Sequence, residues 1–266
     1  MRKTGLSAAS FGKKGEKFEI NENLFAMFRE NNISAIEISL PFGVDFFNLH
    51  FDKIEEYSKK YDVELWSYHL PFSDFYDPSS NDFAYGMQSF KMLIDRASVS
   101  SVKNVVIHPS TELLTDDGRD KRMQNAKRNL SELCDFANGR GIELAVENLP
   151  RLCLGNCAEE MMELVSENSR LKVCFDVNHI AIGTHADFIR KLNDRIVTVH
   201  VADYHIPDNH LMPFDGKLDW KEFITLLNEG NYQGPFLFEC GRAKKDGTFY
   251  DAGIYHRLHK TIEGLN

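Results

Sequence analysis

Six strand-like segments of this chain each end in a side chain that can bind a metal ion. The segments read WSYHL, VVIHP, LAVEN, VCFDVNH, VTVHVAD and FLFEC, and their candidate ligands are His69, His108, Glu147, Asp176, His179, His200 and Glu239. The leading ligands of successive segments lie roughly 24–39 residues apart, about the length of a strand, a helix and their connections. Because His, Asp and Glu are common ligands of divalent cations, this recurrence predicts a metal site assembled from distant strands.

The elements that carry these residues alternate along the whole chain. Strands are predicted at 5–10, 34–39, 63–69, 103–108, 142–147, 171–176, 195–201 and 235–239, and helices at 22–31, 49–60, 82–101, 119–138, 157–168, 185–193, 219–229 and 253–264. Eight strand–helix pairs without a linker predict one α/β domain over residues 1–266, a (β/α)₈ TIM barrel, which typically takes about 250 residues. An open doubly wound sheet is the alternative, but residues 10–15, SFGKKG, do not match its G-x-G-x-x-G fingerprint.

Strand parity predicts which way the candidate ligands point. Side chains alternate between the two faces of a strand, so four of the ligands share a face with Ser67, Val106, Thr198 and Leu237. The opposite face carries bulkier residues, namely Trp66, Tyr68, Val105, Ile107, Val197, Val199, Phe236 and Phe238. We expect the bulkier face to pack on the helices and the ligands to point into the barrel at its carboxyl-terminal mouth. Glu37, in the segment SAIEIS, is also predicted to point inward.

Three of the candidate ligands are carboxylates, and their predicted position calls for a cation. Glu147, Asp176 and Glu239 would repel one another at inward strand ends, because an unpaired ionised group is strongly destabilised out of water. No inward-facing Lys or Arg on these strands could neutralise them. An oxygen-rich ligand set with one imidazole suits one divalent metal, which could be Mn²⁺, Mg²⁺, Co²⁺ or Zn²⁺.

Composition and charge disfavour several classes of protein. The chain has 40 acidic and 31 basic side chains, a net charge of −9, which argues against a nucleic-acid partner. No apolar run reaches the ~20 residues of a membrane helix, and the amino-terminal segment lacks the apolar stretch of a secretory signal. Five cysteines at scattered spacings favour reduced thiols in a cytoplasmic protein over a disulfide framework. A homo-oligomer is compatible with these features.

Five motifs, LAVENLP, CFDVNH, VHVAD, DNHLMPFDGKLDW and FLFECG, follow one another along the chain. In order and strand placement they resemble the xylose isomerase-like barrel superfamily, which contains sugar isomerases, sugar epimerases and endonuclease IV. The resemblance covers the whole length. It implies that Glu147, Asp176, His200 and Glu239 hold one divalent metal and that the two glutamates act as acid and base. DNHLMPFDGKLDW is similar to the family pattern D-x-H-x-x-P-G-x-G-x-I-D-W, with Phe214 where glycine is common.

The resemblance implies a metal-dependent isomerase or epimerase of a small sugar, keto-sugar or sugar phosphate. The metal would chelate the carbonyl and a neighbouring hydroxyl of the substrate and stabilise the enediolate that forms on deprotonation. His179 would bind a substrate hydroxyl. The pocket is predicted to be lined by Phe11, Glu37, Phe72, Arg151, Phe214 and Arg242, and the two arginines are candidates to bind an anionic group.

Two alternatives on the same barrel stay open. Endonuclease IV uses additional zinc ions, and its pattern also matches this chain: His69 and His108 would hold one zinc, and His179, Asp208 and His210 another. That alternative predicts up to three Zn²⁺ and a phosphodiesterase of abasic DNA. Two features argue against it. Leu6 and Ser7 stand where that enzyme has a histidine, and Glu147 is followed by Asn-Leu-Pro where that enzyme has Asn-Thr-Ala-Gly. A lyase or dehydratase would share the first proton abstraction with the isomerase.

Overall fold

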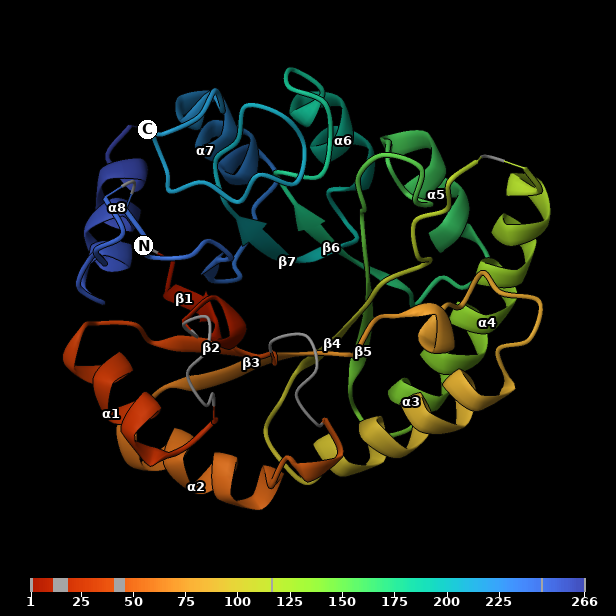
Figure 1. Ribbon diagram of the computed structural model, residues 1–266, viewed down its shortest axis with the longest axis horizontal. Helices are drawn as coiled ribbons and strands as arrows, with labels where there is room; N and C mark the ends of the chain where they lie inside the picture. Colours follow the sequence, from red (N-terminus) through yellow and green to blue (C-terminus); the bar gives the residue numbers. More distant parts are fainter. Residues whose placement is uncertain (1, 12–18, 41–45, 116, 245, 266) are drawn as a thin grey trace.

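The computed structural model describes residues 2–11, 19–40, 46–115, 117–244 and 246–265. Eight parallel strands form a closed barrel in which each strand pairs with its neighbours in sequence order, and the last strand closes on the first. Helices surround the strands on the outside (Figure 1). The predicted (β/α)₈ barrel is therefore confirmed.

Strands and helices alternate along the chain. The strands are β1 (Thr4–Ser7), β2 (Ala35–Ile38), β3 (Glu64–His69), β4 (Asn104–Ile107), β5 (Glu143–Glu147), β6 (Lys172–Asp176), β7 (Ile196–Val201) and β8 (Phe236–Phe238). The helices are α1 (Glu22–Glu30), α2 (Phe51–Tyr61), α3 (Ala84–Ala97), α4 (Arg119–Asn138), α5 (Ala158–Ser166), α6 (His185–Leu192), α7 (Trp220–Glu229) and α8 (Ile254–Glu263). β1 is shorter than the predicted strand at 5–10, because the chain turns into a 3₁₀ helix at Ala8–Phe11.

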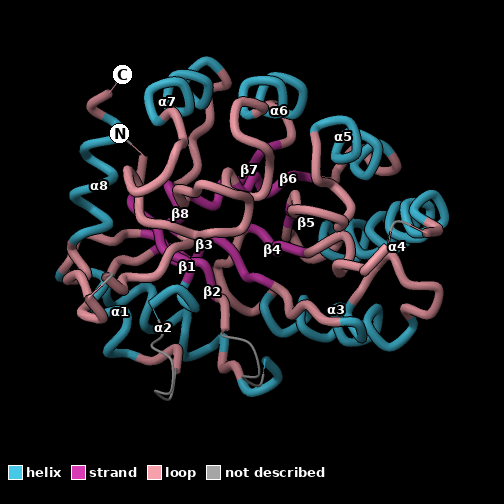
Figure 2. Tube along the Cα trace, turned by 45° about the horizontal axis from the view of Figure 1, so that its top comes forward, coloured by secondary structure: helices cyan, strands magenta, loops and turns pink. Residues whose placement is uncertain are grey.

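Apolar side chains fill two separate regions. The larger region lies between the strands and the surrounding helices (Figure 2), where for example Phe238 of β8 packs 5.4 Å from Tyr255 of α8, measured between ring centroids. The smaller region lies inside the barrel, where Val106, Ala145 and Cys174 pack together. These apolar side chains fill the middle of the barrel interior. The polar side chains at the strand ends therefore lie at the mouth of the barrel, above this apolar layer.

Two irregularities in strand pairing fall at Trp66 and Val197, both of which were predicted to face the helices. The register between β2 and β3 shifts after Ile36, and the register between β6 and β7 shifts after Val173. A shift of one residue turns a side chain to the other face of the sheet. As a result Val197 packs against the interior apolar group, so the prediction that it faces the helices is wrong. Trp66 lines a cavity of about 270 Å³ together with Val197, at the amino-terminal end of the barrel.

The amino-terminal strand is tied to the carboxy-terminal helix. Arg2 forms an ion pair with Glu263 at 2.9 Å, and Thr4 Oγ1 lies 2.8 Å from Nδ1 of His259 on α8. The two ends of the chain accordingly lie side by side in both views (Figures 1 and 2). These contacts attach α8 to the first strand, beside the β1–β8 pairing that closes the barrel.

Two further properties of the chain can be read from the structure. Across the described residues, no helix combines the length and the apolar character needed to cross a membrane. All five cysteines are free, and four of them are buried.

Candidate metal centre and active site

Four candidate ligands converge at the carboxyl-terminal mouth of the barrel. Glu147 and Asp176 end β5 and β6, His200 lies in β7, and Glu239 directly follows β8. The Nδ1 atom of His200 lies 2.9 Å from Glu239 Oε2, 3.2 Å from Glu147 Oε1 and 3.9 Å from Asp176 Oδ2. Parallel strands of a barrel direct their last side chains to one rim. These four residues, whose ligand atoms lie within 4.8 Å of one another, are called the central group.

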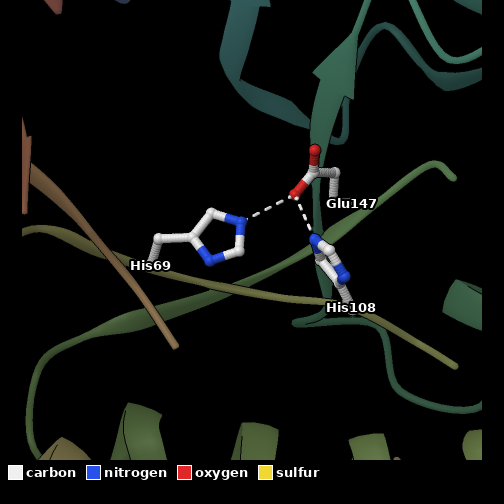
Figure 3. A group of neighbouring side chains, drawn as sticks. All are labelled: His69, His108 and Glu147. Atoms are coloured by element: carbon white, nitrogen blue, oxygen red, sulfur yellow. Dashed lines mark hydrogen bonds and ion pairs between the residues drawn. The ribbon is translucent and has the colours of Figure 1, made fainter. Parts of the chain in front are cut away.

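A second group shares Glu147 with the central group. His69, at the end of β3, and His108, directly after β4, both face the other oxygen of this carboxylate. Glu147 Oε2 lies 3.0 Å from Nε2 of His69 and 3.2 Å from Nε2 of His108, and the two imidazole rings point at this one oxygen (Figure 3). Two imidazoles and a shared carboxylate oxygen are a donor set that can hold a further cation.

A third group consists of Asp176, His179 and His210. His179 Nε2 lies 3.6 Å from Asp176 Oδ2. Asp208 lies at the edge of the group: its Oδ1 is 3.2 Å from His210 Nε2, whereas its Oδ2 forms an ion pair of 2.6 Å with Arg151. Asp208 and His210 have backbone φ angles of 72° and 46°, in the left-handed region. Backbone strain of this kind is concentrated at functional sites, where surrounding contacts hold it in place.

Hydrogen bonds determine which nitrogen carries the proton in three of these histidines. Nδ1 of His69, His179 and His210 lies 2.8, 2.9 and 2.7 Å from the backbone carbonyl oxygens of Leu70, Asn148 and Glu239, respectively. A carbonyl oxygen only accepts hydrogen bonds, so each Nδ1 is the donor and, in the neutral ring, Nε2 presents a lone pair. These lone pairs face carboxylate oxygens. Such an arrangement of acceptors is stable only with a proton or a metal ion between them, and it is the usual arrangement of metal-binding histidines.

Two observations test whether the central group fits a divalent cation. Asp176 Oδ2 is buried and has no hydrogen-bond partner, which is destabilising for a carboxylate oxygen unless a cation contacts it. Within the described part of the chain, the ion-pair partners of Glu147, Asp176 and Glu239 are all histidines, with no Lys or Arg among them. Three oxygen donors and one nitrogen donor therefore fit a divalent metal.

The pKa shifts at the mouth favour charged carboxylates at Glu147 and Glu239 beside a protonated His69, and a neutral ring at His108. Burial raises the pKa of the Glu147 carboxyl, but His200 and His108 together outweigh burial and hold this pKa well below its usual range. Burial also raises the pKa of Glu239, and the charges and hydrogen bond of the neighbouring histidines, His200 first, lower it to about 2. For His69, burial lowers the pKa, but Glu147 raises it to about 9. Asp176 differs, because burial raises its pKa and its unpaired oxygen gains no donor.

A cavity of about 260 Å³ opens onto all three groups. It is lined by His69, Phe72, His108, Ser110, Thr111, Glu112, Glu147, Leu149, Pro150, Arg151, Cys153, His179, Asp208, His210 and Glu239. The Phe72 ring stacks on the His108 ring with 4.5 Å between centroids and forms an apolar wall beside the polar floor. Ligand pockets commonly measure about 300–1,000 Å³, so this cavity fits a small polar ligand.

The residues predicted to line the pocket lie in different places. Phe72 and Arg151 line the cavity. Glu37 is fully buried within β2 and does not line it. Phe11 and Arg242 contact each other, with the guanidinium carbon 3.9 Å from the ring centroid. Glu37, Phe11 and Arg242 therefore lie outside the lining that the described residues form.

Phe214 has a conformation that normally requires glycine. Its φ angle is 75°, at the position where the related pattern commonly has glycine. The Phe214 amide donates to Asp203 Oδ2 at 2.9 Å, and the ring packs against Trp220 with 5.6 Å between centroids. Trp220 Nε1 donates to the same oxygen at 3.1 Å. These contacts offset the strain, and they direct the Phe214 ring to Trp220 instead of the described cavity lining.

Sequence reasoning missed two asparagines that hold Asp176 in place. The Asp176 amide donates to Asn148 Oδ1 at 2.8 Å, and Asn148 Nδ2 donates to the Asp176 carbonyl at 2.9 Å. The Asn178 amide donates to Asp176 Oδ1 at 2.7 Å. Their signal in the sequence was position: Asn148 directly follows Glu147, and Asn178 lies between Asp176 and His179.

Relatives of this chain include proteins with different names. An uncharacterised protein of Methanocaldococcus jannaschii is 29% identical over 260 residues, which cover 90% of this chain and 88% of the relative. A fructoselysine 3-epimerase of Escherichia coli O157:H7 is 27% identical over 114 residues, 40% of this chain and 41% of the relative. A probable endonuclease 4 of Staphylococcus saprophyticus is 27% identical over 137 residues, 46% of this chain and 45% of the relative.

Solved structures resemble this fold over nearly its whole length. A D-tagatose 3-epimerase-like protein superimposes with a TM-score of 0.80 at 23% identity, covering 99% of this chain and 97% of that one. A D-psicose 3-epimerase, crystallised in the presence of D-fructose, superimposes with a TM-score of 0.82 at 18% identity, covering 98% and 99%. At these identities the likeness concerns the fold. The family model described as xylose isomerase-like TIM barrel matches residues 25–258, and the chain therefore belongs to the xylose isomerase-like TIM barrel family.

Proposed function

We propose that this protein is a divalent-metal-dependent epimerase or isomerase of a small sugar or keto-sugar. The observation that carries the proposal is the central group, in which three carboxylates surround Nδ1 of His200 at the floor of a small cavity. Membership of the family and the partial match to a fructoselysine 3-epimerase support the same reaction class. A divalent cation held by Glu147, Asp176, His200 and Glu239 would polarise the substrate carbonyl and stabilise the charge that develops on its oxygen.

Glu147 and Glu239 are the proton-transfer pair in this proposal. Both carboxylates line the cavity, and they approach it from β5 and from the end of β8. One carboxylate accepts the proton from the carbon next to the substrate carbonyl, and the other, after taking a proton from a neighbouring histidine, returns it to the opposite face of the intermediate. Both have pKa values below the usual range, so both are ionised at neutral pH and either can act as the base.

Neighbouring histidines supply protons and contacts to the substrate. His69 lies 3.0 Å from Glu147, and its raised pKa of about 9 keeps a proton beside this carboxylate. His179 lines the cavity, and its Nδ1 is committed to the Asn148 carbonyl. Nε2 of His179, which faces Asp176 at 3.6 Å and Asp208 at 3.7 Å, is therefore the nitrogen that would contact a substrate hydroxyl.

The charge of the cavity favours an unphosphorylated substrate. Among the described lining residues, Arg151 is the one Lys or Arg side chain. Its Nε donates to Glu112 at 2.8 Å and its Nη1 to Asp208 at 2.6 Å. Because both carboxylates already neutralise this guanidinium, a sugar phosphate gains little from it. We therefore propose a neutral ketose-like substrate and no nucleic-acid partner for a cytoplasmic enzyme, and homo-oligomerisation stays a prediction.

The test is proton exchange with solvent. Protein loaded with Mn²⁺ or Co²⁺ is incubated in D₂O with a panel of ketoses, inososes and sugar phosphates, and deuterium incorporation is followed by NMR. We expect exchange at the carbon next to the carbonyl of at least one neutral ketose, and none with Glu239→Gln. Absence of exchange across the panel with metal-loaded protein would overturn the proposal.

A second candidate function is a phosphodiesterase that acts through several zinc ions. It is favoured by one observation, namely that two further ligand groups adjoin the central group and share Glu147 and Asp176 with it. Metal ions that share ligands can clamp the attacking and leaving oxygens of a phosphoryl transfer. The partial match to a probable endonuclease 4 supports this candidate.

Metal content separates the two candidates. Elemental analysis of protein purified without added metal should give about one equivalent for the epimerase, whereas close to three zinc ions would favour the phosphodiesterase. The matching activity assay is cleavage of a duplex with one abasic site. Efficient, salt-sensitive nicking that is lost in His210→Ala would establish the second candidate in place of the first.

A further inference from the structure

Glu37 is a buried carboxylate that the proposed chemistry does not use. It lies in β2 and is fully buried. Its Oε2 atom lies 3.0 Å from Nε2 of His200, and the two residues are 163 positions apart in sequence and on strands that are not neighbours in the barrel. This contact therefore crosses the barrel interior directly beneath the central group.

We propose that Glu37 is a positioning residue that fixes the orientation and the tautomer of His200 for metal binding. This inference rests on the metal centre of the proposed function. Carboxylates face both nitrogens of His200, so a cation held at Nδ1 would leave the ring hydrogen on Nε2, where Glu37 accepts it. Nδ1 would then present its lone pair to that cation, among the three carboxylates of the central group. Carboxylate partners on the far nitrogen of a metal-binding histidine also raise the basicity of the near nitrogen.

A second hydrogen bond holds the Glu37 carboxylate in place. Ser67 of β3 donates from Oγ to the same Oε2 atom at 2.8 Å, and both Ser67 and Glu37 are fully buried. The register shift after Ile36 is what makes this possible, because it pairs Glu37 with Ser67 where an unshifted register would pair it with Trp66. Bulges next to functional sites commonly re-aim a side chain in this way.

The second register shift acts on His200 itself. Because the shift follows Val173, Asp176 lies opposite His200, whereas an unshifted register would place Val199 there. The two irregularities of the barrel thus adjust the two strands that carry the Glu37–His200 contact.

A purely structural role does not account for Glu37. A buried carboxylate is destabilising unless hydrogen bonds or a cation compensate for lost hydration. The other oxygen, Oε1, is buried without a hydrogen-bond partner, and so is Thr198 Oγ1 in the barrel interior. A neutral side chain would fill this space at lower cost, so the charge is explained by the cation that it supports through His200.

The test is metal affinity, measured by calorimetric titration of metal-free protein with Mn²⁺ and by the visible absorption spectrum of the Co²⁺ form. Glu37→Gln keeps the shape of the side chain and removes its charge, and we expect metal affinity to fall about 10–100-fold with an altered Co²⁺ spectrum. Ser67→Ala should cause a smaller decrease in the same direction. Glu64→Gln is the matched control, because this carboxylate pairs with Lys3 at the other end of the barrel, and it should bind metal like the wild type.

The metal affinity and the Co²⁺ spectrum of the variants decide the role of Glu37. Glu37→Gln with affinity within twofold of the wild type and an unchanged Co²⁺ spectrum would overturn the inference. Should Glu37→Gln fail to fold by circular dichroism, Glu37→Asp and Ser67→Ala decide, since wild-type affinity and spectra in both would equally overturn it. Wild-type protein that binds metal but exchanges no sugar proton contradicts the proposed function and leaves the role of Glu37 intact. Wild-type protein that binds no divalent metal contradicts both.

Discussion

Carboxylates at the two ends of the barrel have different kinds of partner. At the amino-terminal end, Glu64 pairs with Lys3 at 2.7 Å and Glu263 with Arg2 at 2.9 Å. At the mouth, the carboxylates of the central group, Glu147 among them, have histidines as their ion-pair partners within the described residues. Lys and Arg stay charged at physiological pH, whereas a histidine can release its proton. The carboxylates at the amino-terminal end are therefore neutralised permanently by Lys and Arg. At the mouth, the histidines hold a positive charge that a metal ion can replace.

Histidines follow the same division. His259, at the amino-terminal end, contacts the Thr4 hydroxyl at 2.8 Å and stacks on Phe236, and burial lowers its pKa to about 4. His69, at the mouth, faces Glu147 and has a pKa of about 9. A hydroxyl can donate or accept, so it satisfies a neutral ring, whereas a carboxylate only accepts. His259 also lies 3.4 Å from Glu263, and His108 at the mouth has a lowered pKa although it faces Glu147, so burial and partner together set the charge of each buried histidine.

The largest effect should come from removing the charge of a mouth carboxylate. We expect Glu147→Gln and Glu239→Gln each to lower the turnover rate by at least about 10²–10⁴-fold, because general acid–base groups contribute that much and metal binding weakens as well. Glu64→Gln, the carboxylate of the other end, should retain full activity. Steady-state assays or deuterium exchange measure the effect, and a loss below tenfold in either mouth variant would contradict the assigned roles.

Metal removal should affect the mouth and leave the other end intact. Dialysis against a chelator should abolish activity and lower the melting temperature, since a metal present at 100 times its Kd stabilises the folded state by about 2.7 kcal/mol. Differential scanning calorimetry with and without Mn²⁺ measures this change. In Glu147→Gln the metal-dependent increase in melting temperature should shrink, and an undiminished increase would place the metal elsewhere.

Intermediate effects are expected from the second ligand group. In a one-metal epimerase, His69→Ala and His108→Ala should lower kcat/KM by about 10–100-fold, the effect of losing a hydrogen bond to a charged group. The central group should still hold its metal, which elemental analysis can verify. Complete loss of activity in either variant with one metal still bound would mean that these histidines do more than assist Glu147.

The smallest effect is a pH dependence at the amino-terminal end. The pKa of His259 is about 4 in the folded protein against about 6.5 in an unfolded chain, so between these values the unfolded state binds more protons. The contribution of His259 to the free energy of unfolding is fully present above pH 6.5. It decreases by about 1.4 kcal/mol per pH unit as the pH falls toward 4. Urea unfolding at pH 7 and pH 5 should show a larger decrease for wild type than for His259→Gln, and equal decreases would contradict the neutral buried ring.

Much of the fold and of the site could be predicted from the sequence. The eight strands were located because apolar runs of strand length alternate with amphipathic helical stretches, and the closed barrel follows from their number. The candidate ligands were located because a barrel collects the last inward residues of its strands at one mouth, and the family resemblance selected the central group among them. Position along a strand is a local property, and sequence carries it directly.

What the sequence by itself determined is therefore which residues reach the mouth, including Glu147, Asp176 and His200. Only the tertiary structure decided their partners: that Glu37 is buried against His200, and that the register shifts turn Val197 inward. These features depend on contacts across the barrel interior, between strands that are distant in sequence, and on pairing shifts of a single residue. The alternation of side chains within one strand predicts neither the contacts nor the pairing shifts, because both depend on how two strands pack together.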